Sequence, residues 1–373
     1  MFLEEPFSMS TVPTPTSGAE PPDPGPDLGP RVLERIFLGP QGLRAGWSVL
    51  LAYGLFYLFR MVIGTVYLAA HLVSENSSFE AVSALALESI PLLAMLGAGT
   101  IMAMVERRRL MDYNLRGPQR VQHFWGGLLA GFVGLSVLIG ALRLGGWLQF
   151  GPVGLSGASI LRFAALWGCA FLVIGFVEEG LFRCYLQFTL TRGLNFWWAL
   201  AAEAALCLYL RVQPQNRGTW GVYVVALLGL FPCLILHQKA AACSAFWQAA
   251  WVTSTFFAMI HTFNGGENWI GIFAAGSIGL VFCASVRITG SAWWAIGCHS
   301  AWDWTETYFY GTADSGLPAR GHLLSSSPVG NPLFSGGADG PEGSVLVFGA
   351  ILFLLFLALM MNARRKSAEH SMT

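Results

Sequence analysis

Two glutamates and an arginine lie inside an apolar stretch of the chain, in the segment FVEEGLFRCYL. Ionisable side chains in a membrane span are costly, so such groups mark a functional site by default. Because Glu179 and Arg183 are four residues apart, we expect them to share a helix face and form an ion pair. Glu178 lies about 100° further round that helix, which leaves its carboxylate available for chemistry.

Two more pairs with helical spacing follow. Phe257 precedes His261 by one turn in FFAMIH, and His299 precedes Asp303 by one turn in AIGCHSAWDW. Residues four apart lie on one helix face, so Phe257 can pack beside His261, and His299 and Asp303 can converge on one point. The predicted His261 lies near the outer end of its helix, whereas Glu178 lies near the middle of the membrane. We therefore expect a short or tilted helix to carry His261.

Together these residues suit the hydrolysis of an amide. Glu178 would accept a proton from water, with the imidazoles of His261 and His299 beside the reacting carbonyl. The alternative is a metal centre, in which zinc or another divalent ion polarises the water. Its ligands would be Glu178, His261, His299 and Asp303. The residues alone leave both alternatives open.

Each pattern also has a structural interpretation when it is taken by itself. A buried Glu–Arg pair can hold helices together or serve as a counter-ion in a transporter, and a histidine at a helix end is usually an interfacial anchor. We interpret the remaining isolated ionisable groups in apolar runs as structural: Arg60, Glu88, Glu203 and Glu306.

Composition identifies the class of protein to which the chain belongs. Of its 373 residues 54% are apolar and only 11% are charged, and 21 Lys and Arg balance 21 Asp and Glu. An ordinary soluble domain carries about 25% charged residues. The absence of a basic excess excludes a nucleic-acid partner, and several apolar runs reach the roughly 20 residues that span a bilayer. We predict an all-α, polytopic integral membrane protein.

About ten transmembrane helices are expected, with ends uncertain by a few residues. The apolar windows are 46–70, 88–105, 124–142, 159–190, 194–210, 220–236, 244–263, 270–286, 290–309 and 344–362. Most Arg and Lys residues in the connections fall on one side of such a bundle, which predicts a multi-pass protein of the cell membrane with both termini cytoplasmic.

The predicted organisation has six parts. Residues 1–45 form a disordered, Pro-rich acidic tail, 46–145 the first transmembrane helices, and 158–310 the domain with the three motifs, including an inserted hairpin at about 203–243. Residues 311–343 are rich in Gly, Ser and Pro, and we interpret them as an extracytoplasmic connection, either a disordered loop or a lid. The last helix spans 344–362, before a basic cytoplasmic tail at 363–373.

The ordered set EExxxR, FxxxH and HxxxD resembles the three motifs of the CPBP family of intramembrane proteases. This family includes the type II CAAX prenyl proteases and the bacterial Abi proteins. VEEGLFRCYLQ is similar to the first motif and GSAWWAIGCHSAWDW to the third, and the resemblance covers roughly residues 160–310. The third motif ends here in Asp303, where many members have Asn.

The resemblance implies a CPBP-like core of about eight helices and an intramembrane endopeptidase that acts on a membrane-associated protein or peptide. It assigns Glu178 as the base, Glu179 as its companion and Arg183 as the residue that holds the pair. His261, His299 and Asp303 would bind a metal or stabilise the oxyanion. Two other classes remain open: a catalytically silent scaffold, chaperone or bacteriocin-immunity protein, and a proton-coupled transporter, although no duplicated half is evident.

Overall fold

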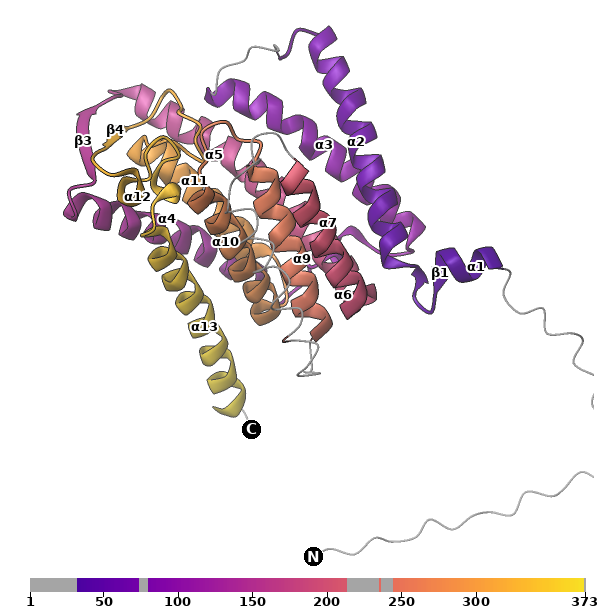
Figure 1. Ribbon diagram of the computed structural model, residues 1–373. Helices are drawn as coiled ribbons and strands as arrows, with labels where there is room; N and C mark the ends of the chain where they lie inside the picture. Colours follow the sequence, from indigo (N-terminus) through magenta and orange to yellow (C-terminus); the bar gives the residue numbers. More distant parts are fainter. Residues whose placement is uncertain (1–31, 74–79, 213–234, 236–243, 372–373) are drawn as a thin grey trace, which may run out of the picture.

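The computed structural model describes residues 32–73, 80–212, 235 and 244–371. The chain is mostly helical, as predicted, with a few short strands at the ends of the bundle (Figure 1). Three helices of 25 residues come first: α2 (Ala45–Ala69), α3 (Ala81–Val105) and α4 (Arg120–Leu144). At a rise of 1.5 Å per residue each is about 37 Å long, enough to cross the hydrocarbon core of a bilayer.

The next helical rod carries the first motif. It joins α5 (Ala158–Glu179), the π-helical turn η2 (Gly180–Leu186) and α6 (Gln187–Gly193) without a break. Two glycines allow neighbouring helices to approach it, because a Cβ at Gly175 would collide with Ser300 and one at Gly180 with the sulfur of Met95. A π-turn inside an α-helix is often found at a functional site. Here it begins directly after the two glutamates.

Four more helices follow this rod in the chain, and two of them, α9 and α11, carry the other motifs. They are α7 (Phe196–Val212), α9 (Ser244–His261), α10 (Trp269–Thr289) and α11 (Trp293–Trp304), which continues as the π-helical η4 (Thr305–Tyr310). The backbones of α4 and α11 are in close contact, since a Cβ at Gly127 or Gly131 would strike a carbonyl oxygen of α11. Small residues at such crossings are typical of membrane helices.

Residues 311–343 have a defined structure, so the expectation of a disordered loop is wrong. They contain β4 (Leu324–Pro328), α12 (Pro332–Ser335) and the 3₁₀ turn η5 (Pro341–Gly343), before α13 (Val347–Ser371). β4 pairs antiparallel with β3 (Leu148–Val153), a strand that the apolar pattern did not predict. The backbone hydrogen bonds between β3 and β4 order this segment, which has no periodic pattern of apolar residues.

The N-terminal prediction also needs a correction. Residues 1–31 lie outside the described part of the chain, but α1 (Val32–Phe37) and the strand pair β1 (Leu38–Gly39) and β2 (Gly42–Leu43) are ordered. Trp47 explains this, because its ring contacts Phe37 and its indole N–H donates to the carbonyl of Ile36. The Pro-rich composition that predicted disorder is confined to the residues before this point.

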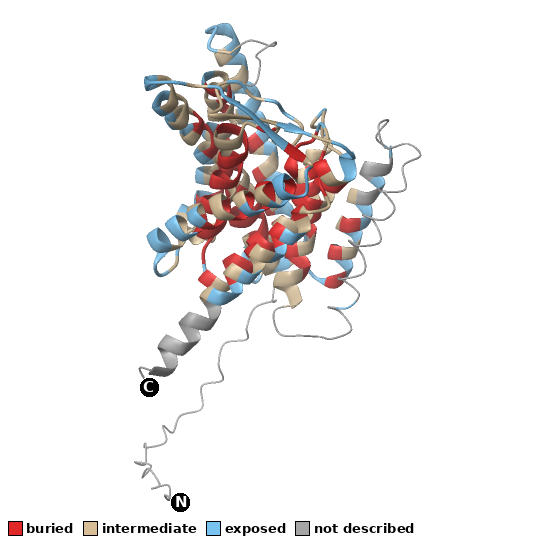
Figure 2. Ribbon diagram, turned by 90° about the vertical axis from the view of Figure 1, so that its left-hand side faces the viewer, coloured by how far each residue is buried: buried red, intermediate tan, exposed pale blue. Residues whose placement is uncertain are grey.

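The bundle has a buried interior, and the outer faces of its helices are exposed (Figure 2). Large apolar side chains such as Leu50, Met61, Trp125 and Leu161 are exposed on the outer faces of the helices, as expected for contact with lipid. Within the described residues, five helices are long and apolar enough to cross a membrane, and two shorter apolar helices accompany them. A polytopic membrane fold is thus supported. The count of ten is not established, and the predicted span 220–236 falls outside the described residues.

Candidate active site

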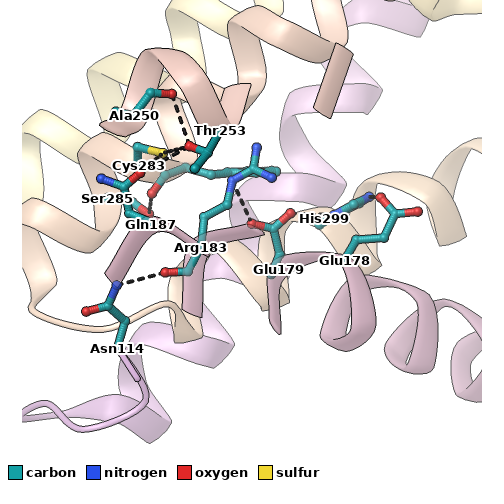
Figure 3. A network of polar contacts seen from close by, with 11 residues as sticks. Asn114, Glu178, Glu179, Arg183, Gln187, Ala250, Thr253, Cys283, Ser285 and His299 are labelled. Atoms are coloured by element: carbon teal, nitrogen blue, oxygen red, sulfur yellow. Dashed lines mark hydrogen bonds and ion pairs between the residues drawn. The ribbon is translucent and has the colours of Figure 1, made fainter. Parts of the chain in front are cut away.

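The first motif forms a fully buried ion pair. Arg183 Nε lies 3.2 Å from Glu179 Oε2, and both side chains are 0% exposed. This confirms the pairing predicted from their spacing. The other oxygen of Glu179 lies 2.9 Å from Nδ1 of His299, so one carboxylate joins the first and third motifs (Figure 3). The contact between helices α5 and α11 was not predicted, because the spacing within one helix cannot reveal it.

Arg183 lies among aromatic rings. Its guanidinium carbon is 4.4 Å from the ring centroid of Phe257 and 5.6 Å from that of Phe282, and these contacts provide cation–π attraction where water is excluded. A glycine makes room for it, since a Cβ at Gly279 would lie 2.6 Å from one of its terminal nitrogens. The π-turn is held as well, because the Asn114 amide donates to the carbonyl of Arg183 at 2.8 Å.

His299 is surrounded by carboxylates on both sides of its ring. Its Nε2 lies 3.5 Å from Asp303 Oδ2 and 3.7 Å from Glu178 Oε2, opposite the Nδ1 contact with Glu179. The predicted convergence of His299 and Asp303 is therefore present. An imidazole that donates from both nitrogens carries a positive charge, and these carboxylates would stabilise that form of the ring. The ring plane stacks on Phe282, which fixes its orientation.

His261 is placed at the end of a short helix, as expected. The helix α9 has 18 residues, and the Nδ1 of His261 donates to the carbonyl of Phe257 at 2.8 Å. This bond occupies Nδ1 and leaves Nε2 available for another contact. The ring of Phe257 lies 4.6 Å from that of His261 and 6.1 Å from that of His299, measured between centroids. Phe257 thus contacts both imidazoles and Arg183.

A cavity of about 220 Å³ is lined by residues of all three motifs, and Glu178 is the residue that the first motif contributes. Glu178, His261, His299 and Asp303 all line it, whereas Glu179 and Arg183 do not. The side chain of Glu178 is 29% exposed and that of Glu179 is 0% exposed. The two neighbouring glutamates therefore have different environments, one facing a cavity and the other held in a dry ion pair. The catalytic roles of these residues stay predictions.

Sequence reasoning missed other carboxylates that line the same cavity. Glu88 was interpreted as structural, and Asp314 and Glu342 belong to the segment that lacked any periodicity. An isolated Glu in an apolar window was the only available signal for Glu88. No pattern in a Gly- and Ser-rich connection could have indicated which acidic residues turn toward the bundle.

The predicted metal ligands do not fit a zinc centre as they stand. Zinc holds its nitrogen and oxygen ligands at about 2.0–2.2 Å, so the ligand atoms must lie close together. In the described part of the chain, no three of Glu178, His261, His299 and Asp303 bring their ligand atoms within 4.8 Å of one another. A different set, in the outer part of the bundle, meets that condition: Glu306, Asp314 and Glu342.

Comparison with known families supports the resemblance inferred from the motifs. Residues 235–305 match the model of a family described as type II CAAX prenyl endopeptidase Rce1-like. No curated protein and no solved structure matches the chain. The matched residues include His261, His299 and Asp303. The match begins after the first motif, which therefore lies outside it. Over residues 235–305 the chain thus matches an Rce1-like family model, in agreement with the resemblance to the CPBP family predicted from the motifs.

Proposed function

We propose that the protein is an intramembrane endopeptidase in which Glu178 activates the attacking water. The observation that carries this proposal is the asymmetry of the two neighbouring glutamates: Glu179 is buried against Arg183, and Glu178 faces the cavity with both imidazoles. A general base must reach solvent or substrate and must not be neutralised by a permanent cation. Glu178 meets both conditions.

The residues present account for each proton in the reaction. Glu178 accepts a proton from water while the water oxygen attacks the carbonyl carbon of the scissile amide. The developing oxyanion accepts a hydrogen bond from Nε2–H of His299, and the imidazole of His261 lies beside it in the cavity. Glu178 then gives its proton to the leaving nitrogen as the C–N bond breaks, and the products are a carboxylic acid, which ionises, and an amine. Glu179 holds the His299 ring from the opposite side.

The size and lining of the cavity suggest the kind of substrate. About 220 Å³ can hold only a few residues of a peptide, and the walls include Phe171, Ile174 and Leu354. A membrane-associated protein or peptide could present such a segment from the bilayer. Because the matched family is described as a CAAX prenyl endopeptidase, a peptide ending in a farnesylated CAAX sequence is the first probe that we would use.

Purified protein in lipid nanodiscs would test the function. We expect wild-type protein to cleave the farnesylated peptide into two products, detected by mass spectrometry. Glu178→Gln keeps the side-chain shape but cannot take the proton, so we expect cleavage to fall by about 10²–10⁴-fold. The matched control is Glu203→Gln, the same change in a buried carboxylate of α7 outside the cavity. Equal rates in the wild type and Glu178→Gln would favour the silent scaffold instead.

We also propose that the cavity opens toward the extracytoplasmic side of the cell membrane, with both chain termini in the cytoplasm. The distribution of Arg and Lys in the connections supports this orientation, because it predicts that residues 311–343 lie outside. Cysteines introduced at Ser327 and Ser367, in a background without the native cysteines, can be labelled with an impermeant thiol reagent on intact cells. Reaction at the Ser327 position alone is expected, and reaction at the Ser367 position alone would reverse the orientation.

A further inference from the structure

A second group of carboxylates lies at the end of the bundle covered by residues 311–343. Glu306 comes from η4, the continuation of the helix that carries His299 and Asp303. Asp314 and Glu342 come from the covering segment. One ligand oxygen from each of the three lies within 4.8 Å of the others. Residues far apart in the sequence therefore converge on one point.

Glu306 is the buried member of this cluster that lacks a partner. Its side chain is 0% exposed, and neither carboxylate oxygen has a hydrogen-bond partner. Within the described ranges, no Lys, Arg or His forms a salt bridge with Glu306, Asp314 or Glu342. A buried carboxylate normally requires a cation or several donors. Glu306 has neither, and it is directed toward two more carboxylates.

The other two members are held by donors that orient their oxygens. Thr307 Oγ1 donates to Asp314 Oδ2 at 3.0 Å. The Trp302 indole donates to Glu342 Oε1 at 2.8 Å, and Ser315 Oγ donates to Glu342 Oε2 at 2.9 Å. Groups that hydrogen-bond to ligand atoms in this way are the usual support of a metal site.

The neighbourhood adds negative charge rather than relieving it. Burial, followed by the charges of Asp303 and Glu342, raises the pKa of the Asp314 carboxyl well above its usual range. Burial, with the charges of Glu342 and Asp339, raises the pKa of Glu267 to about 10. Both groups lie among further carboxylates, and a bound cation would compensate the carboxylates that it contacts.

We propose that Glu306, Asp314 and Glu342 bind a divalent cation, and that this ion is Ca²⁺. All three donors are carboxylate oxygens, which hard cations prefer and which do not favour zinc or copper. One oxygen from each residue lies within 4.8 Å of the others, so a single ion can contact all three, and Ca²⁺ accepts the flexible geometry of such a carboxylate set more readily than Mg²⁺ does. Water would complete the coordination.

The ion would fasten the covering segment to the helix that carries the third motif. Glu306 follows Asp303 on the same continuous helix, while Asp314 and Glu342 come from the cover, and both of the latter line the cavity. Bound Ca²⁺ would therefore hold the cover over the cavity. This inference does not depend on peptidase activity, and its tests measure binding and thermal stability.

Terbium luminescence can test the site in the purified full-length protein. Tb³⁺ replaces Ca²⁺ and emits when a nearby tryptophan is excited, and Trp302 contacts one of the three ligands directly. After treatment with chelator, we expect saturable Tb³⁺ emission from the wild type that Ca²⁺ displaces. Glu306→Gln and Asp314→Asn should each weaken Ca²⁺ binding at least tenfold, while Glu203→Gln should leave it unchanged.

A thermal melt separates loss of the site from loss of the fold. Ca²⁺ should raise the Tm of the wild type and of Glu203→Gln but not that of Glu306→Gln. In chelator, Glu306→Gln should melt no lower than the wild type, which shows that it is folded. The proposal is overturned if the wild type gives no saturable Tb³⁺ emission, if Zn²⁺ displaces Tb³⁺ better than Ca²⁺, or if Glu306→Gln binds Ca²⁺ like the wild type.

Discussion

Two buried acidic centres lie along α11 and its continuation η4, and they are built in opposite ways. In the inner centre, Glu179 is shared between the guanidinium of Arg183 and the imidazole of His299. In the outer centre, Glu306 is equally buried but has no partner among the described residues. The inner carboxylate faces a cation, although the terminal nitrogens of Arg183 have no hydrogen-bond partner, and it can position the groups around it. The outer carboxylate faces no cation in the described residues, which is why we propose that it binds one.

The largest difference should appear when the cation of the inner centre is removed. Arg183→Met leaves Glu179 as a buried charge with only His299 beside it, and we expect a loss of about 3–5 kcal/mol in the free energy of unfolding. The double variant Glu179→Gln/Arg183→Met removes both charges and should recover much of that loss. Unfolding in mixed detergent micelles, followed by circular dichroism, measures both. If the double variant is no more stable than the single one, the ion pair is not what holds this centre.

The same chemical change should have opposite signs in the two centres. Glu179→Gln deprives Arg183 of its partner and should destabilise the protein. In chelator, Glu306→Gln removes a buried carboxyl group that has no partner, and it should stabilise the protein by about 1–3 kcal/mol. The two variants are compared by the same unfolding titration. A destabilised Glu306→Gln in chelator would show that the outer centre has a partner other than a metal ion.

A smaller effect on stability is expected from a neutral side chain at the N-terminal end of helix α10. Asn268 caps helix α10, because its side-chain oxygen accepts from the backbone N–H groups of Ile270 and Gly271. Asn268→Ala should therefore cost about 0.5–2 kcal/mol, while Asn268→Asp should retain the cap. Equal stability of both variants and the wild type would mean that this end of the bundle contributes little to folding.

The sequence predicted what depends on one helix at a time. Both ion contacts at a spacing of four residues, Glu179 with Arg183 and His299 with Asp303, were expected and are present. The short helix that carries His261 was also expected, and it is observed. Helical periodicity fixes which residues share a face, and these are the contacts that it determines.

Contacts between elements could not be predicted in the same way. The bond between Glu179 and His299 depends on the close approach of α5 and α11, which Gly175 permits. The π-turns after Glu179 and after Trp304 left no mark in the apolar pattern. Glu306 was interpreted as an isolated structural group, because its neighbours Asp314 and Glu342 lie in a segment without periodicity.

A single-turnover experiment separates the role that we propose for Glu178 from its contribution to substrate binding. With excess protein and the farnesylated peptide, the cleavage rate and the peptide Kd are measured separately for the wild type, Glu178→Gln and Glu203→Gln. We predict that Glu178→Gln lowers the rate by about 10²–10⁴-fold and leaves the Kd within about twofold, because the amide fills the same space without accepting a proton. A rate within tenfold of the wild type, or an equal loss in Glu203→Gln, would contradict the account.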